Sequence, residues 1–279
     1  MEDYQTFAQR DLSEYEITYL FVDGIAERLR PGAKRGPVLA AWGFTIEGRR
    51  VLLHMMMGSK EDAETVTAFF EDMKRRGLND PLLVTSDGAP GIIKAIEICF
   101  PRAARQRCLA HRMRNLAAKV PEDVWPEFKV RAQAAYQAPS RAIARELAAG
   151  IVADYGRKYD SAVACFIDDF EACIAHLRFP VTQTGDSNHE FARASLRRGA
   201  PPTENHSECV RRESRLEVDV RRAHPRCGAL ALCQGHRVRT RQMAAVRKEL
   251  DEEYEASVGL DARPSKGSAQ PKISSNSRT

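Results

Sequence analysis

The order of strand and helix patterns in the first hundred residues constrains the fold more than any other feature. Residues 15–57 contain three successive strand-like runs separated by glycine-containing turn signals, which predict an antiparallel meander. Residues 59–78, "SKEDAETVTAFFEDMKRRGL", have apolar side chains at helical spacing and acids at the start. They predict an amphipathic helix with Ser59 as its N-cap, ended by Gly77.

The next segments alternate between strand and helix. "PLLVTSDG" at 81–88 is a short apolar run typical of a buried strand, and "APGIIKAIEICFP" at 89–101 predicts a helix. "AARQRCLAH" at 103–111 predicts a strand that leads into a basic helix from about His111. The order is therefore β-β-β-α-β-α-β, which predicts a mixed α/β sheet flanked by helices.

The remainder of the chain divides by texture. Residues 121–179 have an Ala-rich helical pattern with a break near Gln137–Ser140, whereas residues after 182 show neither clean periodicity nor an apolar face. Helical order returns near Arg241. We expect five segments: a first core part at 1–120, a helical insertion at 121–181, an irregular segment at 182–240, a C-terminal helix at 241–262 and a disordered tail at 263–279.

Two aspartates follow strand-like runs, Asp23 in "YLFVDG" and Asp87 in "LLVTSDG". The predicted element order is that of a ribonuclease-H-like core, where the first and fourth strands are neighbours, so the two carboxylates would meet. Close carboxylates repel one another unless a divalent cation lies between them, and oxygen ligands suit Mg²⁺ or Mn²⁺. The alternative is that each Asp-Gly is a turn dipeptide, the better explanation of either one alone. The pair in this strand order favours a metal site.

Composition favours a polyanionic partner and a reducing compartment. The formal net charge is +5, and arginines cluster in "RCLAHRMRNLAAK" and "SLRRGAPPTENHSECVRRESR", a pattern suited to phosphate contacts. The seven cysteines form no CxxC pair and the chain opens with no signal peptide, which predicts reduced thiols in the cytoplasm. No apolar run approaches the roughly 20 residues that span a bilayer, so we expect no membrane association.

Several motifs in order resemble the transposases of mutator-type bacterial insertion sequences. They include "YLFVDGIAERLR", "MGSKEDAETVTAFFEDMKRRGL", "LLVTSDGAPGIIKAIEICFP" and "RQRCLAHRMRNLAAKVP". The resemblance covers roughly residues 10–181 and resumes at about 241–262. It implies a ribonuclease-H-like fold, an Asp-Asp-Glu triad with a helical insertion before the Glu, and a divalent metal. It also implies DNA transposition near the nucleoid, with duplex DNA and a second copy of the chain as partners.

By that resemblance Asp23 and Asp87 are the first two catalytic acids. Cys108 and His111 match the family's Cys-x-x-His signature, with Arg112 and Arg114 as DNA contacts beside it. One Cys–His pair falls short of the four ligands of a structural zinc site. The alternative is that Cys108 packs in the core while His111 and Arg112 face nucleic acid.

The third acid is the main departure from the family. Relatives carry it in a stretch like "TTNLLERLF" after "FPVT", whereas "RFPVT" here precedes "QTGDSNHEFARASLRR". Degenerate codons for Thr184–Ser195, read one nucleotide out of step, permit "RAIRTTNLLER", with the Glu codon across Arg193 and Ala194. The same step at 204–211 permits "KIIPNA". These strings indicate a frameshift from near Thr182 to about Arg241, and they predict an almost inactive chain.

Two further expectations follow. Relatives have a long helical region before the core, and its absence here would weaken recognition of the element's ends. The competing interpretations are an inactive transposase core, a non-catalytic remnant that binds DNA or intact transposase, and an unrelated metal-dependent nuclease of the same fold. Glu190 is the nearest acidic substitute for the third acid, although nothing around it indicates that it reaches the site.

Overall fold

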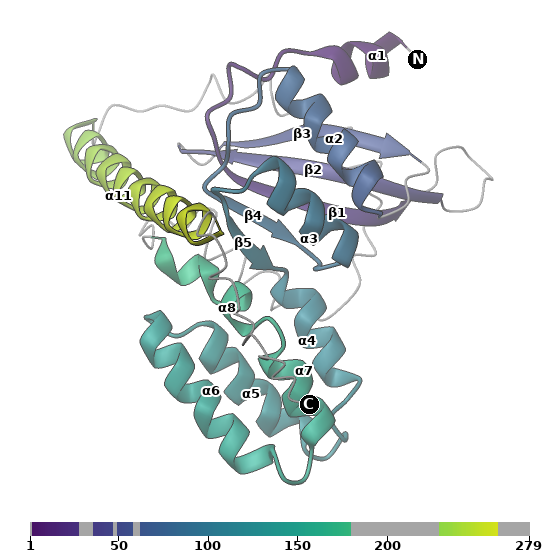
Figure 1. Ribbon diagram of the computed structural model, residues 1–279, viewed down its shortest axis with the longest axis vertical. Coiled ribbons are helices and arrows are strands. Elements are labelled where there is room, and N and C mark those ends of the chain that lie inside the picture. Colours follow the sequence, from purple (N-terminus) through teal and green to yellow (C-terminus); the bar gives the residue numbers. More distant parts are fainter. Residues whose placement is uncertain (1, 28–35, 47–48, 58–61, 180–228, 262–279) are drawn as a thin grey trace, which may run out of the picture.

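A five-stranded mixed sheet forms the centre of the molecule, as the sequence predicts (Figure 1). The structure is a computed structural model, which describes residues 2–27, 36–46, 49–57, 62–179 and 229–261. The strands are β1 (Ile17–Glu27), β2 (Gly36–Thr45), β3 (Arg50–Met57), β4 (Leu83–Ser86) and β5 (Ala104–Arg107). They lie in the order β3-β2-β1-β4-β5, so that β1 occupies the middle of the sheet.

The pairing of the strands confirms both the meander and the contact between the first and fourth strands. β1, β2 and β3 pair antiparallel, whereas β1 pairs parallel with β4, and β4 parallel with β5. The prediction that β1 ends at Asp23 is wrong. Pairing with β2 carries the strand on to Glu27, which lies opposite Gly36, because the antiparallel neighbour supplies hydrogen-bonding partners past the aspartate.

Two helices cover one face of the sheet, α2 (Ala63–Arg75) and α3 (Pro90–Cys99) (Figure 1). The side chains of α2 that recur at helical spacing are buried, as expected for its amphipathic pattern: Val66, Phe69, Phe70 and Met73. They pack with apolar residues of the strands, including Leu20, Leu53 and Val84. This cluster is the larger part of the core that supports the sheet.

The ends of α2 differ in part from the prediction. Its N-cap is Asp62, whose carboxylate accepts a hydrogen bond from the Thr65 N–H at 2.9 Å. The predicted cap, Ser59, lies outside the described residues. Gly77 does terminate the helix, and its φ of +96° is a conformation that only glycine adopts without strain.

A group of helices lies beyond the β5 edge of the sheet (Figure 1). Its members are α4 (Leu109–Ala117), α5 (Trp125–Tyr136), α6 (Arg141–Tyr155), α7 (Asp160–Ile167), α8 (Phe170–Cys173) and the 3-10 turn η1 (Ala175–Arg178). The predicted break near Gln137–Ser140 is confirmed, because Ser140 caps α6 by accepting the Ile143 N–H. These helices enclose an apolar cluster of their own around Phe128, Tyr136 and Phe166.

The other face of the sheet is covered by α11 (Ala229–Asp261). Met243, Val246 and Leu250 of this helix are buried against a cluster that contains Tyr19 of β1 and Leu83 of β4. The helix begins twelve residues before the expected start at 241, so part of the segment predicted as irregular is helical. The rest of that segment and the expected tail lie outside the described residues.

A short helix, α1 (Glu2–Gln9), precedes the sheet and was not foreseen in the sequence. Within the described ranges, no helix has both the length and the apolar character needed to cross a membrane.

Candidate active site

The parallel pairing of β1 and β4 brings the two predicted acids to equivalent positions. Phe21 lies opposite Thr85, and Asp23 and Asp87 each follow two residues later. Continuing this register places the two aspartates on neighbouring chains, which are roughly 5 Å apart in a sheet. Residues two apart share a face of a strand, so both acids belong to the face that α11 covers, where Tyr19 and Leu83 are buried. Both are half-buried.

The backbone after β4 holds Asp87 in place. Its Oδ1 accepts a hydrogen bond from the Ala89 N–H at 2.9 Å, immediately before Pro90 opens α3. Gly88 between them has a φ of +87°, a left-handed conformation that favours glycine. The Asp-Gly dipeptide is therefore a real turn. It also presents a carboxylate at the end of a buried strand, so the turn and site interpretations are compatible.

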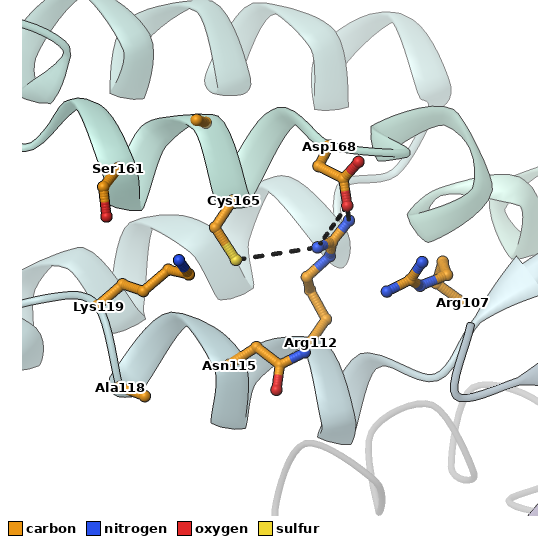
Figure 2. A pocket seen from close by; sticks show the side chains of 9 residues that line it. Arg107, Arg112, Asn115, Ala118, Lys119, Ser161, Cys165 and Asp168 are labelled. Carbon is orange, nitrogen blue, oxygen red and sulfur yellow. Dashed lines mark hydrogen bonds and ion pairs between the residues drawn. The ribbon is translucent and has the colours of Figure 1, made fainter. Parts of the chain in front are cut away.

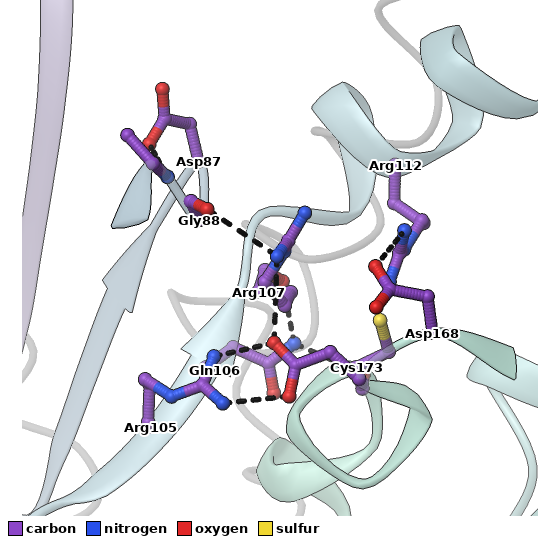
Figure 3. A network of polar contacts seen from close by, with 10 residues as sticks. Asp87, Gly88, Arg105, Gln106, Arg107, Arg112, Asp168 and Cys173 are labelled. Atoms are coloured by element: carbon purple, nitrogen blue, oxygen red, sulfur yellow. Dashed lines mark hydrogen bonds and ion pairs between the residues drawn. The ribbon is translucent and has the colours of Figure 1, made fainter. Parts of the chain in front are cut away.

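Arg107 supports the same turn from β5. Its Nη1 donates to the Gly88 carbonyl at 3.4 Å, and its side chain is only 12% exposed. A Cβ at position 88 would lie 2.1 Å from the Arg107 Cζ, so the end of the Arg107 side chain would have to move, and the positive φ itself favours glycine. Figure 3 shows the Arg107 guanidinium beside this turn, and its Nη1 also donates to Asp169 Oδ2 at 3.5 Å.

The predicted Cys-x-x-His pair lies at the start of α4, next to the aspartates. The Cys108 N–H donates to the Ser86 carbonyl at 2.7 Å, which joins α4 to the residue that precedes Asp87. Interaction with the Cys108 thiol raises the pKa of His111, and the negative charge of Asp23 adds to the effect. The pair and the first acid therefore share one electrostatic environment.

The two predicted arginines have different surroundings. Arg114 is exposed in the last turn of α4. Arg112 is 2% exposed, and its two terminal nitrogens each donate to Asp168 Oδ2 at 3.1 Å. Arg112 therefore faces α7, whereas Arg114 faces the surface.

The aspartates fit a magnesium-type ion by chemistry. Mg²⁺ and Mn²⁺ prefer oxygen ligands, and Mg²⁺ commonly uses one or two carboxylates and completes its shell with water or substrate. Within the described residues, three or more His, Cys, Asp or Glu side chains nowhere gather closely enough to hold a metal. Asp23 and Asp87 would supply two oxygen ligands, and a metal site here would need others.

A polar network beside the acids was missed in the sequence (Figure 3). Arg105 of β5 donates two hydrogen bonds to Asp169, at 2.5 and 2.6 Å. The Gln106 side chain donates to the Cys173 carbonyl at 3.0 Å and accepts a hydrogen bond from the His176 N–H at 2.9 Å. These contacts hold α8 and η1 against the edge strand β5. The one available signal was the alternation of basic and polar residues in "ARQR", which is unusual for a strand.

The fold is that of a mixed α/β protein whose five-stranded sheet is flanked by helices, with one half-buried acid in β1 and another directly after β4. Comparison with known proteins identifies the family. The chain matches the family model "Transposase, Mutator family" over residues 1–193, and it belongs to that family.

Individual relatives agree. The chain is 32% identical over 179 residues to the transposase for insertion sequence element IS6120 of Mycolicibacterium smegmatis, covering 64% of this chain and 55% of the relative. It is 33% identical over 178 residues to the IS1081 transposase of Mycobacterium tuberculosis, with 63% and 40% covered. It is 31% identical over 194 residues to the IS256 transposase in transposon Tn4001 of Staphylococcus aureus, with 67% and 48% covered. The chain therefore spans about half the length of these relatives.

Proposed function

We propose that this chain is the catalytic-core part of an insertion-sequence transposase with a ribonuclease-H-like fold, whose reaction is metal-dependent cleavage and joining of DNA strands. The observation that carries the proposal is the parallel register of β1 and β4, which brings Asp23 and Asp87 to equivalent positions on one face. The strand order and the antiparallel meander support the fold assignment. The names of the relatives support the reaction class.

Each residue has a defined role in the proposal. Asp23 and Asp87 hold Mg²⁺ or Mn²⁺, and the bound cation would supply charge neutralisation at a phosphodiester. Two hydrogen bonds orient the loop that carries Asp87. The Ala89 N–H donates to the Asp87 carboxylate, and Arg107 donates to the Gly88 carbonyl. His111 lies close enough to Asp23 that the negative charge of this acid helps to raise the pKa of the imidazole. The exposed Arg114 contacts the DNA backbone.

We further propose that this copy has little or no strand-transfer activity. The sequence after Thr182 lacks the expected third acid. A shifted reading of Thr184–Ser195 permits a glutamate, and the same shift at 204–211 permits a second family-like string. Loss of one member of a catalytic unit commonly lowers the rate by orders of magnitude.

The division of the chain into a core, a helical insertion at 121–181 and a C-terminal helix is also part of this proposal.

The first experiment is calorimetric titration of the chain with Mn²⁺. Replacement of Asp23 or Asp87 by Asn should each lower the affinity at least tenfold, because each removes a charged ligand. Asp123→Asn is the matched control, since Asp123 is exposed between α4 and α5. Unchanged affinity in both site variants would refute the metal site.

The second experiment tests the frameshift. A gene with the reading frame restored between codons 182 and 241 should cleave terminal-repeat DNA in Mn²⁺ at least a hundredfold faster than the present chain. Adding Asp87→Asn to the restored protein should abolish that gain. Robust cleavage by the unrestored chain would contradict the proposed inactivity.

The second candidate function is a non-catalytic remnant that binds DNA or intact transposase. The missing third acid in the sequence favours it. It predicts DNA binding that does not depend on Mn²⁺ and that persists in Asp23→Asn and Asp87→Asn. DNA binding lost on metal removal would favour the catalytic core instead.

A further inference from the structure

A pocket of about 630 Å³ lies between α4 and α7, next to the candidate active site (Figure 2). Arg112, Asn115 and Lys119 line it from α4, and Ser161 and Cys165 line it from α7. Arg107 closes the end nearest the sheet. In Figure 2 the cationic side chains follow one another along the pocket, from Lys119 through Arg112 to Arg107.

The lining has an excess of positive charge. Three cations, Arg107, Arg112 and Lys119, face one acid, Asp168. That acid is already engaged by Arg112, at 3.1 Å, and its side chain is 65% exposed. Arg107 is paired with Asp169 at 3.5 Å and Arg112 with Asp168 at 3.1 Å, so the excess positive charge of the lining comes from Lys119, and it favours an anion.

Two buried donors lie behind the pocket lining. Among the described residues, neither Arg112 Nε nor Arg107 Nε makes a hydrogen bond, and both atoms are shielded from solvent. Arg112 is 2% exposed, and its guanidinium also interacts with the Cys173 thiol. Both guanidinium groups therefore add positive charge behind the pocket, and Lys119 is the exposed cation that a phosphate would contact.

The pocket is joined to the candidate active site through one side chain. Arg107 lines the pocket and also donates to the Gly88 carbonyl, one residue after Asp87. A nucleic-acid strand that presents one phosphate to the metal-binding acids would therefore have its neighbouring phosphates close to this pocket. Arginine and lysine are the side chains that most often contact phosphates.

We infer that the pocket between α4 and α7 is a binding site for backbone phosphate of the DNA strand that passes Asp87. The inference rests on the proposed function, because it assumes that DNA is the substrate. Lys119 and Ser161 form its outer wall, and Arg107 and Arg112 its inner wall. It assigns to α4 and α7 a direct role in holding DNA, in addition to packing.

The test is fluorescence anisotropy of a labelled duplex with the full chain over a range of NaCl concentrations. Lys119→Glu should weaken binding about tenfold at low salt and reduce the slope of log K against log [NaCl] by about one, the value of one lost phosphate contact. Lys94→Glu is the matched control, because Lys94 is exposed on α3, which covers the face of the sheet opposite to α11. It makes the same change in net charge and should alter the affinity by less than threefold.

A second variant approaches the pocket from its other wall. Ser161→Glu places a carboxylate in the first turn of α7, where negative charge favours the helix, so the fold should persist. It should also weaken DNA binding about tenfold, with an unchanged thermal midpoint. Equal losses in Lys119→Glu and Lys94→Glu, or no loss in either pocket variant, would overturn the inference.

Two further arms separate the possible failures. If inorganic phosphate binds the pocket tightly and Lys119→Glu abolishes that binding without affecting DNA, the site is for a small anion and the inference fails. Mn²⁺ titration reports on the proposed function separately, because Lys119→Glu should leave the affinity for Mn²⁺ unchanged. A chain that fails to bind Mn²⁺ but still loses DNA affinity in Lys119→Glu would refute the metal site and retain the phosphate pocket.

Discussion

Asp169 is the residue whose replacement should most clearly separate charge pairing from backbone strain. Its carboxylate receives two hydrogen bonds from Arg105, at 2.5 and 2.6 Å, and lies 3.5 Å from Arg107. Its side chain is 20% exposed and that of Arg105 is 23% exposed. Its φ of +55° is left-handed, and it is the only described non-glycine residue with a positive φ. Asp tolerates this conformation better than Ala does.

The magnitude can be worked from these contacts. Removing one partner of a fully buried ion pair costs 3–5 kcal/mol, and partial exposure of both partners reduces this to about 2 kcal/mol here. Placing Ala in the left-handed conformation adds about 1 kcal/mol. We therefore expect Asp169→Ala to lower the free energy of unfolding by about 3 kcal/mol, and Asp169→Asn, which keeps the tolerance of left-handed φ, by about 2 kcal/mol.

Urea unfolding followed by circular dichroism at pH 7 measures these differences. Asp123→Ala is the control and should stay within about 0.5 kcal/mol of the parent, since Asp123 is exposed. An Asp169→Ala protein within about 0.5 kcal/mol of the parent would refute the structural role of the network. Equal losses for Ala and Asn would refute the backbone contribution.

Three other predictions concern pH, the turn after β4 and the docking of α11. Hydrogen bonds from two arginines of α6 lower the pKa of Glu171 to about 2. The stability that this carboxylate contributes is present above its ordinary pKa of 4.5 and is lost as pH falls towards 2. Glu171→Gln should therefore flatten that part of an acid-unfolding curve. Gly88→Ala should weaken Mn²⁺ binding at least tenfold in calorimetry, because Ala is strained at a φ of +87° and its Cβ would displace the Arg107 guanidinium from the carbonyl next to Asp87. Mn²⁺ affinity equal to the parent's would contradict it. Leu250→Ala should destabilise the protein by about 2–4 kcal/mol in urea, since Leu250 is 5% exposed against the sheet, and a loss below about 1 kcal/mol would indicate that α11 is not docked there.

Much of the fold was predictable because the signals are local. The period of the apolar residues in 59–78 predicted α2, and the glycine at 77 predicted its end. The strand patterns in 15–57 predicted the meander. Each of these depends on residues within one or two turns or on a neighbouring strand, where chain connectivity limits the alternatives.

Other expectations failed where a distant partner decides the outcome. β1 continues beyond Asp23 because β2 pairs with it, and an Asp-Gly dipeptide alone contains no information on that pairing. Arg112 and Arg114 are two residues apart in a basic helix and are indistinguishable by composition. Arg112 is buried because α7 brings Asp168 to it, 56 residues along the chain.

The order of the elements, the candidate acids Asp23 and Asp87 and the family resemblance all follow from the residues alone. The three-dimensional fold was needed to show that β1 and β4 pair in parallel two residues before each acid, and that Arg107 joins the turn after Asp87 to a cationic pocket. The physical reason is range. Periodicity and turn chemistry act between near neighbours in the chain, whereas the surroundings of a charged side chain depend on which remote helix or strand packs against it.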